Sequence, residues 1–152
     1  MIVFGINTGL RISDMLELKV KDVKNRDYFF VKERKTDKKR KIPMVPSVKP
    51  EIEKYIVGLK PDDYLFKSMR SKKPISRIQA YRILNEAAGK LGIEEIGTHT
   101  MRKTFGYHFY QRQRDLALIQ KVFNHSSPSI TMRYIGLEED EIMQGYAAFG
   151  GL

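Results

Sequence analysis

The sequence predicts an α+β fold that is mainly α-helical, with a small antiparallel β-hairpin near its N-terminus. Apolar residues recur at helical spacing between capping residues through the second half of the chain. One aromatic and β-branched run, residues 28–31, departs from this pattern and is typical of a strand. A length of 152 residues suits one core, so residues 1–152 are expected to form a single domain.

Two short helices are predicted before the hairpin. Residues 1–8 are apolar and form the end of a helix that stops at Gly9. Ser13 is the expected N-cap of a second helix, which runs to residue 18 and turns Met15, Leu16 and Leu18 inward.

The hairpin follows, and then another helix. Residues 27–32 and 41–45 are the predicted strands, and the polar residues 35–38 between them suit a hairpin loop. A helix is expected to begin near Pro50, which suits the first helical position, and to stop at Gly58.

The clearest helix of the chain begins after Ser76. Ser76 is its expected N-cap, and Gly92 is expected to end it. Its predicted inner stripe consists of Ile78, Tyr81, Leu84, Ala88 and Leu91.

Four more helices complete the prediction. One covers residues 98–111, and the next runs from Asp115 to Asn124, with Leu116, Ile119 and Val122 inside. Residues 127–128, Ser-Pro, start a third. The acidic tail opens the last, because carboxylates suit the positive end of a helix.

Positive charge is concentrated in the body of the chain. The net charge is +10, but residues 138–152 hold four acidic and no basic side chains, so residues 1–137 carry 28 basic against 14 acidic groups, a net +14. Clustered cations release counterions from a phosphate backbone, so binding to a nucleic acid is favoured over a surface tuned only for solubility. The candidate DNA-binding residues are Lys32, Arg34, Lys38, Lys39, Arg40, Lys72, Lys73, Arg77 and Lys103.

Several other classes are disfavoured. The chain has no Cys, which excludes disulfides and thiolate metal sites. No apolar run approaches the roughly 20 residues of a membrane span, and no signal-peptide pattern opens the chain, so a cytoplasmic, nucleoid-associated protein is expected. Phosphate-loop, dinucleotide-binding and HExxH motifs are missing, and no acidic cluster suits a two-metal nuclease. Neither a cofactor nor a metal is therefore expected.

Five polar residues lie in apolar surroundings: Arg11, His99, Arg102, His125 and Tyr134. Arg11 has core-like neighbours on both sides, so it needs an anion or a buried partner. His99 and Arg102 are three residues apart in a predicted helix and are expected to share a face. Each of the five is, by itself, more often structural than catalytic, so only their combination in this order is informative.

In that order, their surroundings resemble the catalytic domain of the tyrosine recombinases, the phage integrase family. Residues 8–18, TGLRISDMLEL, resemble the first arginine box, and residues 99–105, HTMRKTF, resemble the HxLRHTF box. Residues 123–127, FNHSS, resemble the LGHSS box, and residues 130–134, ITMRY, the tyrosine box. Residues 35–43, KTDKKRKIP, resemble the hairpin that carries a catalytic lysine. The resemblance covers nearly the whole chain.

The resemblance implies a site-specific recombinase that cleaves and rejoins DNA through a 3′-phosphotyrosine, without metal or ATP. Tyr134 would be the nucleophile, with the arginines and His125 on the scissile phosphate, His99 assisting, and Lys35 protonating the leaving oxygen. The implied catalytic residues are thus Arg11, Lys35, His99, Arg102, His125 and Tyr134.

The chain departs from the family pattern at three points. Lys103 replaces a His, and Asn124 replaces a Gly whose left-handed conformation Asn also tolerates. Family members usually carry an N-terminal core-binding or arm-binding domain, which is expected to be absent from residues 1–152.

The resemblance also implies a homotetramer on DNA for a full-length protein, whereas this chain alone is expected to be monomeric. Residues 138–152 are acidic and then apolar, so they either dock on a neighbouring protomer or fold back on their own domain. Two alternatives to recombination remain open: DNA relaxation of the type IB topoisomerase kind, and a non-catalytic DNA-binding remnant.

Overall fold

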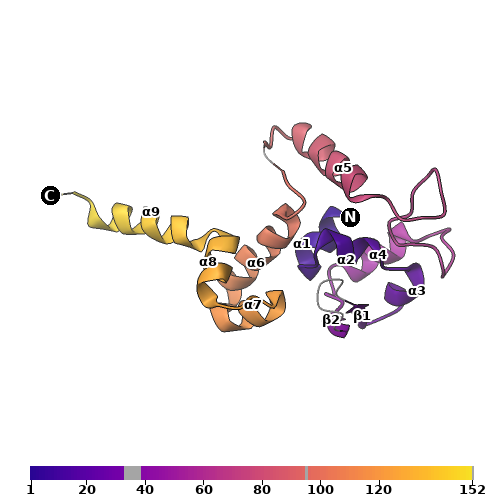
Figure 1. The fold of residues 1–152 in the computed structure, drawn as a ribbon, viewed down its shortest axis with the longest axis horizontal. Helices are drawn as coiled ribbons and strands as arrows, with labels where there is room; N and C mark the ends of the chain where they lie inside the picture. Colours follow the sequence, from indigo (N-terminus) through magenta and orange to yellow (C-terminus); the bar gives the residue numbers. More distant parts are fainter. Residues whose placement is uncertain (33–38, 95, 152) are drawn as a thin grey trace. The chain divides into compact units, whose positions relative to one another are not determined.

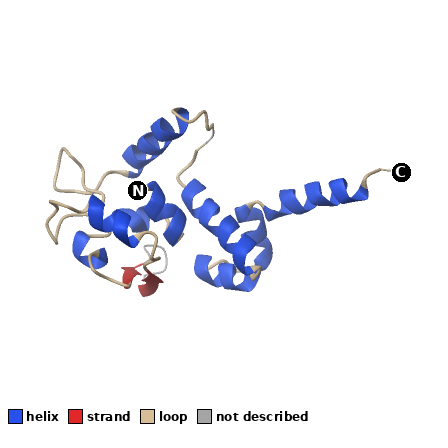
Figure 2. Cartoon of the chain, turned by 180° about the vertical axis from the view of Figure 1, so that it is seen from behind, coloured by secondary structure: helices blue, strands red, loops and turns tan. Residues whose placement is uncertain are grey.

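The computed structural model describes residues 1–32, 39–94 and 96–151. Helices dominate this part of the chain, and its two strands form one small sheet (Figures 1 and 2). The predicted class, a mainly helical fold with one antiparallel hairpin, is confirmed. The chain divides into two compact units, Met1–Arg102 and Lys103–Leu152, which we describe one at a time.

The first unit opens with two helices joined by a tight turn. α1 (Ile2–Thr8) ends as predicted at Gly9, whose φ of 62° is the left-handed conformation that glycine adopts without strain. α2 (Ile12–Leu16) begins after Arg11, so the prediction of Ser13 as its N-cap is wrong. The reason is that the Arg11 carbonyl already accepts from the amide of Met15 at 3.0 Å, which starts the helical ladder two residues earlier.

A short helix that the sequence pattern did not predict follows. α3 (Val20–Val23) is one turn long, too short to show a helical period. The carboxylate of Asp22 caps it by accepting from the Lys19 amide at 2.8 Å. Both valines at its ends are buried, which fixes the turn against the core of this unit.

The predicted hairpin is present, with its second strand shifted. β1 (Tyr28–Lys32) pairs antiparallel with β2 (Lys39–Pro43), and Tyr28 lies opposite Pro43. The sequence placed the second strand at residues 41–45, two residues late, because only its apolar end was recognised. The residues between the strands, including the predicted loop 35–38, lie outside the described ranges.

α4 (Lys49–Tyr55) holds Pro50 in its first turn and ends before Gly58. α1, α2, α3, α4 and the sheet contribute to one hydrophobic core, together with Ala80, Leu84 and Met101 of two later helices. Met15, Leu16 and Leu18 lie in it, as predicted. Its largest fully buried side chains are Phe4, Met15, Val20, Val23, Phe29, Val48 and Leu65.

α5 (Arg77–Gly89) has the predicted N-cap but a different inner face. The Ser76 hydroxyl accepts from the Gln79 amide at 3.1 Å, and the Gln79 side chain accepts from the Ser76 amide at 2.8 Å. The buried stripe is Ala80, Leu84 and Ala88, so only Leu84 and Ala88 of the five predicted residues are buried. Ile78, Tyr81 and Leu91 are exposed, and Gly92 lies in a turn beyond the helix end.

The second unit contains most of α6 (Thr100–Gln113), with α7 (Leu116–Phe123), α8 (Pro128–Ile135) and α9 (Leu137–Phe149). The predicted caps are confirmed: the Asp115 carboxylate accepts from the Leu118 amide at 2.9 Å, and Asn124 is left-handed with φ of 53°. Ile119, Phe123, Ile135 and Leu137 form its buried core.

Among the residues that the structure describes, no helix combines the length and apolar character needed to cross a membrane.

Candidate functional site

Arg11 finds the buried partner that its surroundings require. It lies between the buried Leu10 and Ile12, and its own side chain is 24% exposed. Its guanidinium Nη1 is 3.9 Å from Oδ2 of Asp14, a carboxylate that is almost wholly buried. Because Asp14 lies one helical turn further along, α2 itself carries the anion that holds Arg11 at the helix start.

Arg102 is buried beside the same turn. Only 3% of the residue is exposed, and its Nη1 donates to the carbonyl of Gly9 at 2.5 Å. A carbonyl at the end of a helix has no partner within that helix, so it is available to this side chain. The structure therefore brings Arg102 to a carbonyl two residues before Arg11, although the two arginines are far apart in the chain.

A missing side chain lets these segments approach. A Cβ atom on Gly5 would lie 2.5 Å from Sδ of Met101 and 3.1 Å from its Cβ, which is closer than packed atoms come. Gly5 thus lets α1 lie against the first turn of α6, next to Arg102. Sequence reasoning missed Gly5, because a glycine within a helix gives no sign of what packs against it.

His99 was predicted to share a helical face with Arg102, and this prediction is wrong. It is exposed and lies in the turn before α6, because the Thr100 hydroxyl accepts from the Gly97 amide at 2.9 Å and the helix begins at Thr100. Because His99 precedes the helix, the spacing of three residues does not place it on the same helical face as Arg102.

The second unit brings His125 and Tyr134 together. Their ring centroids are 5.2 Å apart at an interplanar angle of 76°, and Phe123 contacts both rings. The left-handed Asn124 ends α7 and reverses the chain, so that His125 lies against α8. Both residues are half-buried, so each side chain packs against the core of this unit and is partly accessible to solvent.

The His125 ring is held by a residue that sequence reasoning missed. Its Nδ1 is 3.1 Å from Oγ1 of Thr131, which has no exposed surface. The side-chain amide of Gln120 donates to the His125 carbonyl at 3.1 Å and fixes the backbone as well. Thr131 lies in the tyrosine box, one helical turn before Tyr134. A hydroxyl residue at that spacing was the sequence signal that could have indicated a partner for His125.

Lys103 lies close to Tyr134 in this unit. Its Nζ lies 5.9 Å from the centroid of the Tyr134 ring, at the outer limit of a cation–π contact. This residue was predicted as a DNA-binding lysine, and the structure also gives it a place beside the candidate nucleophile.

The predicted hairpin residues are only partly covered by the structure. Lys35, Arg34 and Lys38 lie outside the described residues. Lys32 and Lys39 are exposed on the outer face of the sheet, and the Nζ of Lys39 lies 4.5 Å from the centre of the Phe30 ring. Arg40 is half-buried in β2.

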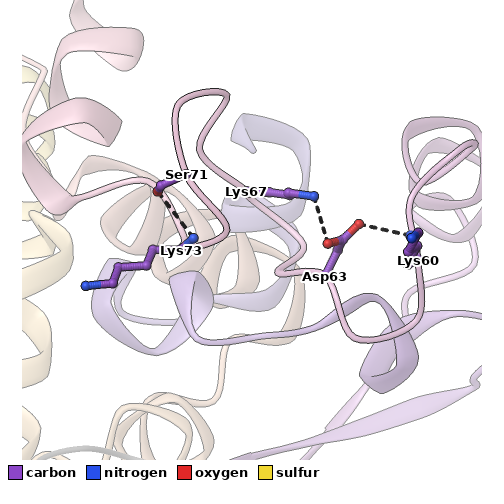
Figure 3. Close-up of polar contacts among 5 residues, drawn as sticks. All are labelled: Lys60, Asp63, Lys67, Ser71 and Lys73. Atoms are coloured by element: carbon purple, nitrogen blue, oxygen red, sulfur yellow. Dashed lines mark hydrogen bonds and ion pairs between the residues drawn. The ribbon is translucent and has the colours of Figure 1, made fainter.

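The remaining predicted DNA-binding residues are exposed in the first unit. Arg77 is the first residue of α5. Lys72 and Lys73 lie in the loop before it, where the Lys73 amide donates to the Ser71 hydroxyl at 3.3 Å and the Lys73 side chain extends away from the loop (Figure 3).

Three carboxylates of the first unit are held in ion pairs with lysines. Hydrogen bonds from Lys21 and Lys67 lower the pKa of Asp62 and of Asp63 below their usual value of 3.8. Lys49 lowers the pKa of Asp27 in the same way. Each of these carboxylates therefore neutralises the lysine that it pairs with, and the other cations of the unit carry the remaining positive charge.

The predicted residues therefore lie in two groups. In the first unit Arg102 is bonded to the Gly9 carbonyl, two residues before Arg11, and in the second unit the rings of His125 and Tyr134 are in contact. In the described ranges, no group of three His, Asp or Glu side chains is placed to hold a metal ion.

Comparison with known proteins places this geometry in a family. The model of the phage integrase family matches residues 1–141. The Bacillus subtilis (strain 168) protein named "Probable integrase/recombinase YoeC" is 63% identical over 150 residues, which are 99% of this chain and 83% of that protein. Tyrosine recombinase XerA of Pyrococcus furiosus is 34% identical over 131 residues, 84% of this chain and 46% of XerA.

Solved structures share the fold. A XerH site-specific recombinase bound to a palindromic difH substrate, in a post-cleavage complex, matches with a TM-score of 0.77 and 21% identity, over 99% of this chain and 45% of that one. A XerA recombinase crystal structure matches with a TM-score of 0.76 and 24% identity, over 97% and 56%.

The chain spans most of YoeC but about half the length of the Xer recombinases that it matches. These relatives are integrases and tyrosine recombinases, which favours the recombinase prediction over the topoisomerase alternative. The chain belongs to the phage integrase family, the family of the tyrosine recombinases.

Proposed function

We propose that this chain is the catalytic part of a site-specific recombinase, with Tyr134 as the residue that attacks DNA. The observation that carries the proposal is the contact between Tyr134 and a His125 ring that the buried Thr131 fixes in orientation. A half-buried phenol beside an oriented imidazole is an arrangement for phosphate chemistry, since one group attacks while the other binds an oxygen.

Arg11 and Arg102 would clamp the scissile phosphate. Their planar guanidinium groups can each hold two phosphate oxygens and follow the negative charge into the transition state. The contacts to Asp14 and to Gly9 hold both side chains in place before DNA binds, so less ordering remains to be done at the reaction.

The reaction would then proceed by an in-line displacement. The Tyr134 Oη attacks phosphorus, its proton passing to a base for which His99 is the candidate, and forms a 3′-phosphotyrosine. The bond to the 5′-oxygen breaks, and that oxygen takes the electron pair and a proton from Lys35. Attack by a 5′-hydroxyl reverses the step and rejoins the strand, because the covalent bond keeps the energy of the phosphodiester.

A nicked suicide duplex tests the nucleophile. The unmodified chain should form a covalent protein–DNA adduct, whereas Tyr134→Phe should form none and still bind the duplex. Tyr110→Phe is a matched control, since Tyr110 is another half-buried tyrosine of the same unit, on α6, and should leave the adduct unchanged. Adduct formation by Tyr134→Phe would refute the assignment. A chain without any adduct would favour the DNA-binding remnant.

A chemical rescue tests Lys35. A 5′-bridging phosphorothiolate leaves without needing a proton, so it should restore cleavage to Lys35→Ala. Failure of the rescue would move the role to another lysine of the hairpin.

The partner, location and assembly belong to the same proposal. Double-stranded DNA is the partner and the cytoplasmic nucleoid the location, and a full-length recombinase acts as a tetramer on DNA. In this assembly α9 docks on a neighbouring protomer, because Ile142, Met143, Tyr146 and Phe149 are all exposed along it. Sedimentation on DNA, with and without residues 138–152, should show higher assemblies only when these residues are present.

A further inference from the structure

The loop between α4 and α5 has a firmly held base. The Ser68 amide donates to the Lys73 carbonyl and the Ile75 amide to the Phe66 carbonyl, both at 2.9 Å. The Lys67 ammonium donates to Asp63 at 2.8 Å, and the other oxygen of this carboxylate accepts from the Lys60 amide at 3.0 Å (Figure 3). These bonds close the loop at its base, so its tip is presented in a defined position.

The tip carries an apolar side chain among cations. Met69 is 100% exposed, so it contributes nothing to the core of its own chain. The neighbouring Arg70, Lys72 and Lys73 are exposed as well, and the sequence has no Asp or Glu between positions 64 and 85. Met69 is therefore an apolar side chain in water, with cations and no acidic residue near it in the sequence. Such a combination suits a polyanion that also offers an apolar surface.

We propose that residues 68–73 bind duplex DNA through its minor groove, with Met69 entering the groove and the three cations on the flanking phosphates. Methionine is one of the apolar side chains that press against sugars or between base steps and bend the duplex. This inference rests on the proposed function, because it needs a chain that binds DNA. It adds an apolar contact at a loop where the sequence predicted only charged contacts. An anionic membrane is the less suitable partner, since one methionine buries little area and stable anchoring takes more than one signal.

A single tryptophan can report on the contact. The chain contains no Trp, so Met69→Trp would place its only indole at the loop tip. Binding of a mixed-sequence duplex of about 30 base pairs, long enough to bend measurably, should shift its emission and shield it from acrylamide quenching. Val57→Trp is the matched control, because Val57 is also an exposed apolar residue of the first unit, 80% exposed but outside residues 68–73, and its emission should not respond.

Affinity and salt dependence separate the apolar contact from charge. Met69→Ala should weaken duplex binding about fivefold, equivalent to about 1 kcal/mol, with an unchanged salt slope. Arg70→Gln should instead reduce the salt slope by about one. Met69→Lys decides between the two: tighter binding would mean that only charge acts at the tip and would overturn the proposal, whereas weaker binding supports it.

Three further outcomes would overturn the inference. Protection of the indole from acrylamide by phosphatidylserine vesicles but not by DNA would make the loop a membrane contact. A Met69→Trp variant that binds DNA while its indole stays exposed would refute the loop contact alone. A parent chain that binds no duplex at all would refute the proposed function together with it.

Discussion

Substitution of Gly5 by alanine should damage the phosphate-binding arginines from a distance. The new Cβ would lie 2.5 Å from Sδ of Met101 and 3.1 Å from its Cβ and Cε, so Met101 must move. Met101 is 5% exposed, and the next residue is Arg102, bonded to the Gly9 carbonyl. The substitution therefore forces a shift at the base of the Arg102 side chain.

Two opposing effects set the magnitude. Overpacking a filled core costs about 1–3 kcal/mol, whereas alanine in place of glycine in a helix stabilises it by about 1 kcal/mol. The expected net loss in the free energy of unfolding for Gly5→Ala is therefore about 0–2 kcal/mol. Urea unfolding measures this change, and the rate of adduct formation on a nicked duplex should fall by more than the stability loss accounts for.

A control and a double mutant test the reasoning. A Cβ atom added to Gly89, the last residue of α5 in the same unit, would meet nothing within 4 Å, so Gly89→Ala should be neutral or slightly stabilising. In a Met101→Ala background the 2.5 Å contact with Sδ no longer exists, and Gly5→Ala should cost less than in the parent chain. The same cost in both backgrounds would refute the proposed contact.

Two further predictions concern the second unit and the loop base. Thr131→Val keeps the side-chain shape but removes the hydroxyl next to His125, so adduct formation should slow about tenfold. Thr131→Ser keeps the hydroxyl and should retain most activity. A pH–rate profile of Thr131→Val that is unchanged from the parent would contradict this role. Lys67 lowers the folded-state pKa of Asp63 below 3.8, so this carboxylate stabilises the fold fully above that pH and progressively less as pH falls through the folded value. Thermal unfolding of Asp63→Asn should accordingly be less sensitive to pH than that of the parent between about pH 2 and 5, and equal sensitivity would exclude the pair as a source of acid lability.

The prediction of elements succeeded where the chemistry is local. Asp115 and Asn124 delimit α7, and Ser76 starts α5, because a cap is formed by a side chain and amides only a few residues away. It failed for the inner face of α5, where the small Ala80 is buried and the large Ile78 is exposed. Which side of a helix is buried depends on what packs against it, and side-chain size alone does not tell.

The family, the fold class and the identity of the candidate residues could all be predicted from the sequence, because they follow from local patterns in a fixed order. Only the tertiary structure shows which groups hold these side chains: the Gly9 carbonyl holds Arg102, and the buried Thr131 holds His125. The fold also placed His99 outside the helix that spacing had assigned to it. The physical reason is that a cap or turn is specified within a few residues, whereas the partner of a buried polar group comes from wherever the chain returns to meet it.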